Sequence, residues 1–378
     1  MSPLQPGEVV TGLEIGPVAH GGHFVARHEG QVIFVRHALS GELVDVQITD
    51  VNRRFARGFV VAVQRASEHR VTPPCPVAGR CGGCDFQHVS AAHSRELKRQ
   101  VVAEQLAHLA GYQFTGTVAE VLPAPLQWRS RMRYRLDGQG RPGLLAHRSR
   151  EIVPLPEGGC RIALPQIASP GVQARADGGE LLAIATADGL FIDPNDPTEV
   201  TERVGERSYQ VAGDGFWQPH TSAAATLSEA VVAALAPQPG EVAFDLYCGV
   251  GLFAGALAAA GCMVWGIEGS TKAVELARRN VPTARFLAGD VARRLTRLPG
   301  RADLVVLDPP RTGTDADVLA QLVRRSPRRI AYVACDPAAL GRDLLTLDQL
   351  GYVPSAVSAY DLFPLTHHVE CLAILEPR

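Results

Sequence analysis

Apolar strand-like segments alternate with helix-like segments through residues 206–378. Strands are expected at Val242–Tyr247, Met263–Glu268, Ala284–Leu287, Asp303–Leu307 and Arg329–Ala334, and helices at Ala254–Ala260, Thr271–Asn280, Asp315–Arg325 and Pro337–Leu350. This alternation predicts an α/β fold with a doubly wound parallel sheet. The last two expected strands, Val353–Ser358 and Val369–Leu375, have no helix between them and can pair as an antiparallel hairpin.

A glycine turn follows the first of these strands. Gly249 and Gly251 let the backbone approach a ligand without a Cβ in the way. Glu268 ends the next strand, where its carboxylate can accept hydrogen bonds from two ribose hydroxyls, and Asp290 follows the third strand. The turn also matches the dinucleotide fingerprint, so both NAD and S-adenosyl-L-methionine (SAM) fit it. Asp308-Pro-Pro, after the fourth strand, resembles a methyltransferase motif and favours SAM.

Cys335 lies in Tyr-Val-Ala-Cys-Asp-Pro, between the fifth strand and the helix that follows it. The carboxyl ends of strands are where open α/β sheets bind ligands, so this thiol is expected beside the cofactor. A nucleophile there indicates covalent catalysis, which most methyl-transfer reactions do not need. The alternative is that Cys335 only packs in the core.

Four of the eight cysteines form a pattern. Cys75, Cys81 and Cys84 fall within ten residues, and Cys160 follows alone. Clustered thiolates repel one another unless a cation gathers them, and four soft ligands suit either zinc or an iron–sulfur cluster. Zinc usually takes two short Cys-x-x-Cys pairs, so three clustered ligands with a remote fourth favour a [4Fe–4S] cluster.

The rest of the chain divides at composition changes. Residues 1–65 contain short strand-like runs with glycine turns and predict a small β-barrel. Residues 66–205 hold the four cysteines and an expected amphipathic helix near Ser94–Ala110. Residues 206–378 form the α/β domain. Asp193-Pro-Asn-Asp-Pro197 reads as a turn-rich connection.

One stretch of the middle region is basic, although the net charge of the chain is −2. Arg129, Arg131, Arg133 and Arg135 alternate, so on a strand they would share one face. The alternation predicts a stripe that follows RNA phosphates; a merely solvated strand face is the alternative.

The N-terminal residues show no secretory signal, and no apolar run is long enough to cross a bilayer. We therefore expect a cytoplasmic protein without a membrane partner, and a monomer by default.

Together these motifs resemble the RNA 5-methyluridine (uracil-C5) methyltransferase family, in its form with an N-terminal TRAM domain (an RNA-binding barrel of OB type) and a four-cysteine [4Fe–4S] site. The resemblance rests on the barrel and on the motifs Phe216-Trp-Gln, Asp245 to Gly251, Asp308-Pro-Pro-Arg, Cys335-Asp-Pro and His368-Val-Glu. It implies a class I SAM-dependent enzyme that acts on a uridine of 23S ribosomal RNA or transfer RNA.

The resemblance also implies roles for individual residues. Cys335 would be the nucleophile and Glu370 the base. The expected SAM contacts are Gln218, Tyr247, Leu252, Glu268 and Asp290, with Asp308 lining the site, and the cluster ligands are Cys75, Cys81, Cys84 and Cys160. Leu252, Ala334, Asp336 and His220 depart from residues frequent in the family. Pro337 suits a first helical turn, which would help Cys335 to ionise.

Two rivals from other classes stay open. One is an RNA-binding or RNA-folding factor that has kept the fold but lost the activity, and the other is an NAD-dependent oxidoreductase on the same sheet. Within methyltransferases, enzymes that act on exocyclic amines also carry an Asp-Pro-Pro motif, but they need no nucleophilic cysteine.

Overall fold

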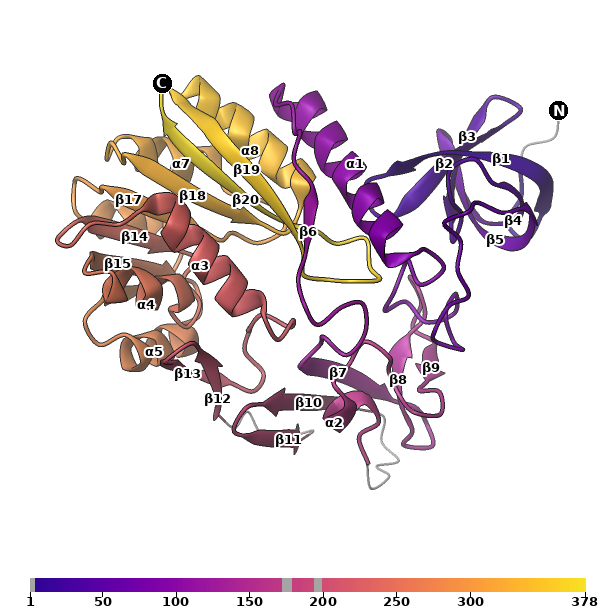
Figure 1. The fold of residues 1–378 in the computed structure, drawn as a ribbon, viewed down its shortest axis with the longest axis horizontal. Coiled ribbons are helices and arrows are strands. Elements are labelled where there is room, and N and C mark those ends of the chain that lie inside the picture. Colours follow the sequence, from indigo (N-terminus) through magenta and orange to yellow (C-terminus); the bar gives the residue numbers. More distant parts are fainter. Residues whose placement is uncertain (1–3, 172–178, 194–198) are drawn as a thin grey trace.

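The N-terminal region is a closed five-stranded barrel (Figure 1). The computed structural model describes residues 4–171, 179–193 and 199–378. The barrel strands are β1 (Val9–Ala19), β2 (His23–His28), β3 (Gln31–Arg36), β4 (Leu43–Val51) and β5 (Phe55–Arg65). Side chains alternate between the interior and the surface along β2 and β4, and Phe24, Ile33 and Val46 fill the interior. The β-barrel predicted from the sequence is confirmed.

A second sheet follows in the middle of the chain, with strand order β11-β10-β7-β8-β9. Its elements are β7 (Arg131–Leu136), β8 (Pro142–Leu145), β9 (Ile152–Pro154), α2 (Pro165–Ala168), β10 (Glu180–Thr186) and β11 (Gly189–Asp193). Trp128, Tyr134 and Cys160 belong to its core. The turn expected over residues 193–197 lies, after its first residue, outside the described residues.

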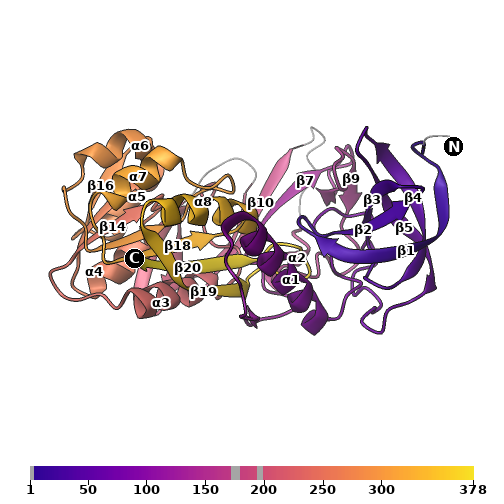
Figure 2. The same cartoon turned by 90° about the horizontal axis from the view of Figure 1, so that it is seen from above.

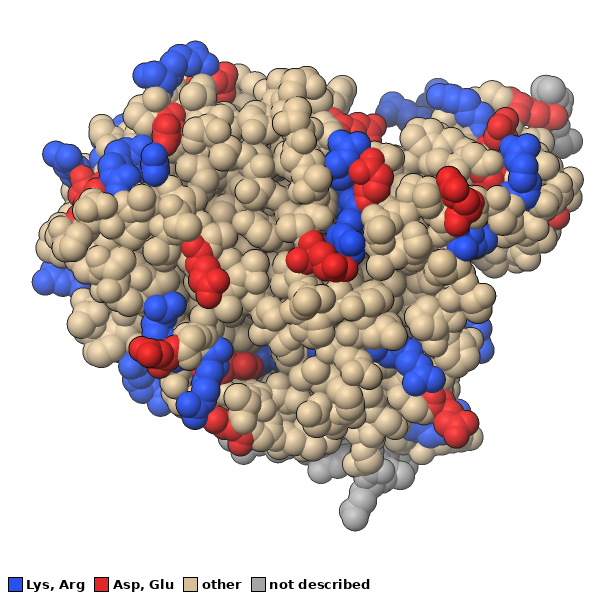
Figure 3. All heavy atoms as spheres, in the orientation of Figure 1, with Lys and Arg blue, Asp and Glu red and all other residues tan. Residues whose placement is uncertain are grey.

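The arginines of β7 are paired with acids, and of the three only Arg133 and Arg135 share an exposed face, so the stripe that follows phosphates stays a prediction. Arg131 is buried and its Nε lies 3.3 Å from Oε1 of Glu202. Arg133 and Arg135 both pair with Glu180, at 2.8 and 2.6 Å. Because these partners come from other strands, the sequence run alone gave no sign of them. On the face shown in Figure 3, Lys and Arg are interspersed with Asp and Glu rather than gathered.

The C-terminal region is a doubly wound sheet, as predicted. Its order is β16-β15-β14-β17-β18-β20-β19-β6, and all neighbours are parallel except those of β20. The strands are β6 (Val118–Glu120), β14 (Val242–Leu246), β15 (Met263–Glu268), β16 (Arg285–Ala288), β17 (Leu304–Leu307), β18 (Arg329–Ala334), β19 (Tyr352–Asp361) and β20 (Glu370–Pro377). The expected antiparallel ending is confirmed by the pairing of β20 with both of its neighbours.

Helices cover both faces of this sheet. They are α3 (Ala223–Leu235), α4 (Leu252–Ala259), α5 (Thr271–Asn280), α6 (Val291–Arg294), the 3₁₀ turn η1 (Leu295–Arg297), α7 (Ala316–Val323) and α8 (Pro337–Gln349). Along β18, Ala331 and Val333 pack on the side of α3 to α5, whereas Ile330 and Tyr332 pack on the side of α6 to α8. The strand is therefore buried on both sides, as a parallel sheet requires.

The middle of the chain also contributes to this sheet. Helix α1 (Ala91–Ala110) packs beside α8, and β6 pairs with β19 as an edge strand (Figure 1). A hairpin of β12 (Glu199–Val204) and β13 (Arg207–Ala212) packs on α5. The sequence predicted α1 but neither β6, this hairpin nor α3. Figure 2 shows the α/β region and the barrel at opposite ends of the molecule, with α1 between them.

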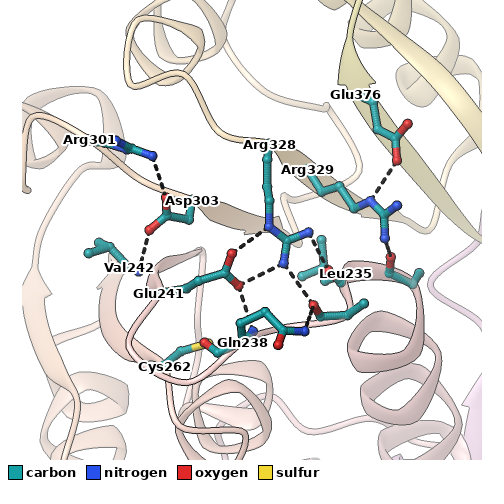
Figure 4. A network of polar contacts seen from close by, with 12 residues as sticks. Leu235, Gln238, Glu241, Val242, Cys262, Arg301, Asp303, Arg328, Arg329 and Glu376 are labelled. Carbon is teal, nitrogen blue, oxygen red and sulfur yellow. Dashed lines mark hydrogen bonds and ion pairs between the residues drawn. The ribbon is translucent and has the colours of Figure 1, made fainter.

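Arginine side chains close the amino end of the sheet, away from the cofactor turn (Figure 4). Arg328 makes two bonds to Glu241, at 2.6 and 2.8 Å, and donates to the carbonyl of Leu235 at the end of α3. Arg329 pairs with Glu376 at 2.7 Å. Cations suit the carboxyl end of a helix, so this network fixes α3 to the sheet. No helix in the described parts of the chain is long and apolar enough to span a membrane.

Candidate active site

A large cavity of about 890 Å³ opens at the carboxyl ends of the central strands. Parallel strands present ligands at this edge, next to the point where the strand order reverses between β14 and β17. The residues predicted for the site that line the cavity are Gln218, Tyr247, Glu268, Asp290, Asp308, Cys335 and Glu370. Leu252 is not among the lining residues; it is buried and packs in the core at the start of α4.

The glycine turn after β14 holds the carboxylate of Glu268. Gly249 and Gly251 have φ angles of 53° and 92°, which only glycine adopts without strain. The amide of Gly249 donates to Oε2 of Glu268 at 3.1 Å, and the amide of Ser270 donates to Oε1 at 2.8 Å. Tyr247, just before the turn, has a φ of 63°, a strained value for a residue with a side chain. The turn thus fixes one acid at the cavity wall.

Asp245 supports the turn from inside the sheet. Its Oδ2 accepts from the amide of Ala254 at 2.7 Å, while Oδ1 has no partner among the described residues. Burial raises the pKa of Asp245 to about 8, so the carboxyl is mostly protonated at neutral pH. The sequence did not predict this role, although an acid four residues before the first glycine of the turn was a visible signal.

Asp290 and Asp308 complete the acidic wall. Asp290 caps α6 and accepts from the amide of Arg293 at 3.1 Å. Burial, and then the charge of Glu268, raise the pKa of Asp308 to about 7. The cavity is lined mainly by apolar surface, and these acids supply the few polar groups that could meet the hydroxyls and amines of a nucleoside. Phe216, at the rim, exposes 72% of its surface.

Cys335 and Glu370 lie at the same end of neighbouring strands. Ala334 of β18 pairs with Cys371 of β20, which places Cys335 and Glu370 one position further along the two antiparallel strands. Burial, and then the charge of Glu370, raise the pKa of Cys335 to about 11. Burial, and then Asp308, raise the pKa of Glu370 well above its usual range, whereas Arg311 lowers the pKa of both groups.

The first amides of α8 are not available to Cys335. Pro337 does open α8, but Asp336 caps it, and its Oδ1 accepts from the amides of Ala338 and Ala339 at 3.0 and 2.9 Å. The helix amides are therefore used by a carboxylate and not by the thiol. Surrounding acids and burial decide the pKa of Cys335 instead.

The four predicted cluster ligands lie around one small cavity. It is about 30 Å³ in volume and is lined by Cys75, Cys81, Cys84 and Cys160, all free thiols. The described residues hold no group of three or more His, Cys, Asp or Glu side chains arranged for a single metal ion. Thiolates around one zinc ion would converge to about 2.3 Å from it.

The four thiols line one shared cavity, and four soft sulfur donors suit an iron–sulfur cluster or zinc. Burial raises the pKa of Cys84 and Cys160, so these sulfurs need a bound cation to ionise. Arg129 lies partly buried beside them, and burial lowers its pKa. Its charge is opposite to that of a cluster with four thiolate ligands.

The fold and the cavity define a class I methyltransferase with an appended barrel, and comparisons with known proteins agree. Residues 183–378 match the family model described as tRNA (Uracil-5-)-methyltransferase, and residues 4–61 match the TRAM domain. An uncharacterized RNA methyltransferase of Streptomyces avermitilis is 43% identical over 97% of this chain and 98% of its own.

Two further relatives carry specific names. The 23S rRNA (uracil(1939)-C(5))-methyltransferase RlmD of Shewanella sp. strain ANA-3 is 30% identical, over 94% of this chain and 93% of its own. The tRNA (uracil-54, C5)-methyltransferase of Pyrococcus abyssi, solved with S-adenosyl-L-homocysteine, superposes with a TM-score of 0.73 at 21% identity, covering 96% of this chain and 99% of that one. The latter likeness shows the fold.

The chain belongs to the tRNA (uracil-5-)-methyltransferase family and carries a TRAM domain. It is thus a SAM-dependent RNA uracil-C5 methyltransferase in class, and the NAD-dependent reading is wrong.

Proposed function

We propose that this protein forms 5-methyluridine at one uridine of 23S ribosomal RNA, with Cys335 as nucleophile and Glu370 as base. The observation that carries the proposal is the single cavity of about 890 Å³. Its wall joins the acids that suit a nucleoside cofactor, Glu268 and Asp290, to the thiol and the buried carboxyl. Ribosomal RNA is favoured by the resemblance to the Shewanella enzyme, and transfer RNA is the alternative.

The reaction needs a nucleophile because carbon C5 of uracil is a poor one. When Cys335 Sγ adds to C6, the electron pair of the C5–C6 bond moves toward O4 and C5 becomes an enolate carbon. Bound SAM would supply the electrophilic methyl group to C5 and would leave as S-adenosyl-L-homocysteine. Glu370 then accepts the C5 proton, and the Sγ–C6 bond breaks to release the product.

The charges of the site bear on these steps. Both Cys335 and Glu370 must lose a proton to act, and burial opposes both ionisations. Arg311 is the nearby cation that lowers both pKa values. Residues that would hold SAM are Gln218, Tyr247, Glu268, Asp290 and Asp308, whereas Leu252 would act only by packing.

We also propose a [4Fe–4S] cluster held by Cys75, Cys81, Cys84 and Cys160. The four thiols around one cavity, and the partly buried Arg129 beside them, support it. With four protein ligands no iron has an open position, so the cluster would stabilise the middle region and take no part in methyl transfer. Zinc remains the alternative occupant.

The proposed division of labour follows the chain: residues 1–65 bind RNA, residues 66–205 hold the cluster, and residues 206–378 perform the methyl transfer. Strand β5 ends at Arg65, and α1 and β6 fix the second part to the third.

The test is trapping with RNA that contains 5-fluorouridine in place of uridine. Fluorine at C5 blocks the final proton removal, so the enzyme and SAM should yield a methylated RNA–protein adduct on Cys335, visible on a denaturing gel and assigned by peptide mass spectrometry. Transcripts of 23S and transfer RNA, each containing 5-fluorouridine, are compared. The Cys335→Ser variant is the control. RNA binding without any adduct would instead support a non-catalytic RNA factor.

A further inference from the structure

The TRAM barrel reaches the nucleophile motif directly. Its β1–β2 loop, residues 20–22, lies against the α/β region, where Nε2 of His20 is 3.1 Å from Oδ2 of Asp336. Gly22 in the same loop has a φ of 76°, and a Cβ there would lie 2.6 Å from Cβ of His367. The loop packs so closely against His367 that only glycine fits at position 22. His20 of the same loop contacts Asp336, the residue that follows Cys335.

A second cavity, of about 50 Å³, lies under this loop. It is lined by His20, Val101, Arg311, Cys335, Asp336, Pro337, His367, His368 and Val369. Cys335 and Arg311 also line the large cavity, so the two compartments meet at the nucleophile. A nucleotide whose uracil contacts Cys335 from the large cavity has its ribose and phosphate close by, and the small cavity is the adjoining space.

The polar groups of the small cavity favour an anion. Arg311 has no ion pair within the described residues; its one hydrogen bond is to Nε2 of His368, at 3.3 Å. Burial, with the charges of His367 and Arg311, lowers the pKa of His368 to about 3, so it is neutral and can accept that bond.

The acids of the small cavity are already engaged. Asp336 is bonded by His20 and by two helix amides, so its charge is largely compensated. Its hydrogen bond raises the pKa of His20, which favours the protonated ring. His367 contacts Asp85 at 2.6 Å. The groups left to meet a ligand are the guanidinium of Arg311 and Nδ1 of His20, whose Nε2 is the atom that bonds to Asp336 and whose side chain is 41% exposed.

We propose that this small cavity is a phosphodiester subsite for the RNA strand that carries the target uridine, and that the barrel supplies one of its donors, His20. The inference rests on the proposed function in that the uracil is taken to lie at Cys335. The barrel then contacts the reacting nucleotide in addition to binding RNA elsewhere. A single phosphate shared by His20 and Arg311 sets the register of the strand.

The experiment measures binding of a fluorescent short oligouridylate at pH 6.5 over a range of salt concentrations. Each phosphate contact on a single strand contributes about 0.7 to the slope of log K against log salt. His20→Ala should lower the slope by about that amount, and His20→Gln, which can still bond to Asp336 but carries no charge, should lower it equally. The control is His28→Ala, at the far end of strand β2.

The outcomes separate the subsite from other roles of the loop. Equal slopes for wild type, His20→Ala and His28→Ala would overturn the proposal, as would an oligouridylate that the wild type does not bind at low salt. A slope lost in His20→Ala but kept in His20→Gln would show that His20 only holds Asp336. Binding of the oligouridylate needs no methyl transfer. A missing adduct in the trapping experiment would therefore refute the proposed function without changing the interpretation of the salt dependence.

Discussion

The raised pKa of Cys335 gives the sharpest prediction, because it reverses what the helix start alone suggests. The side chain is half-buried, and the carboxyls of Glu370, Asp308 and Asp336 oppose a second negative charge beside them. Arg311 opposes this effect only in part, and the pKa of the thiol is about 11, against 9.0 for an ordinary cysteine. The experiment varies the pH of the free protein, without SAM or RNA, and follows the alkylation of Cys335 at each pH.

The expected alkylation rate of Cys335, relative to an ordinary thiol, follows from two opposing effects. At pH 7 a thiol with a pKa higher by two units has about a hundredfold less thiolate. Its thiolate is also more nucleophilic, by about six- to tenfold for a Brønsted coefficient of 0.4–0.5. Cys335 should therefore react about ten- to fifteenfold more slowly than an ordinary thiol at pH 7. From there its rate should rise about tenfold per pH unit and continue to rise past pH 9, where an ordinary thiol levels off.

The assay is alkylation by labelled iodoacetamide, with quantification of the peptide that contains Cys335 by mass spectrometry. The control is a synthetic peptide with the sequence of residues 332–337, which keeps Asp336 but lacks the burial of the fold and the carboxyls of Glu370 and Asp308. A rate for the protein that levels off at or below pH 9, or that exceeds the rate of the peptide at pH 7, would refute the assignment of the pKa to burial and acidic neighbours.

Further predictions follow from the same structure. Glu370→Gln should lower turnover about 10²- to 10⁴-fold and accumulate a methylated adduct on RNA with ordinary uridine; a loss of turnover without an adduct would argue against the role as base. Cys160→Ser should abolish the visible absorbance and the iron content of anaerobically purified protein, and stoichiometric zinc in the wild type would contradict the cluster. Lys98 is fully buried with Nζ 2.6 Å from Oδ1 of Asp361. Lys98→Met should therefore cost about 3–5 kcal/mol in unfolding free energy, while Lys98→Met combined with Asp361→Leu should recover most of it in thermal melts. Equal losses in the single and double variants would contradict a charge left unpaired.

Much of the site could be predicted because its residues follow strand ends. Parallel strands bring their carboxyl ends to one edge, so Glu268 and Cys335 were expected together from their places after strands, and Asp308 from its resemblance to a methyltransferase motif. Glu370 was placed by resemblance, and the antiparallel register of β20 puts it at the same edge. Leu252 failed as a lining residue because its side chain turns into the core under the glycine turn.

The contacts that the sequence did not reveal join distant segments. The alternating arginines of β7 suggested a free stripe. In the folded chain Glu180 and Glu202 lie beside them and pair with them. The bond from His20 to Asp336 spans most of the chain, and nothing in either local pattern indicates it. Both cases depend on which surfaces fold against each other, and charge counts along a strand carry no information on that.

The sequence by itself determined the local features: a doubly wound sheet, a small barrel, a set of four cysteines that line one cavity in the fold, and a thiol at a strand end beside acids. These follow from periodicity, turn residues and spacing, which act over a few residues. Only the tertiary structure decided the protonation of Cys335, the pairing of the arginines and the approach of the barrel to the nucleophile. Burial and Coulomb interactions depend on distance in space, and the chain brings those groups together only when it folds.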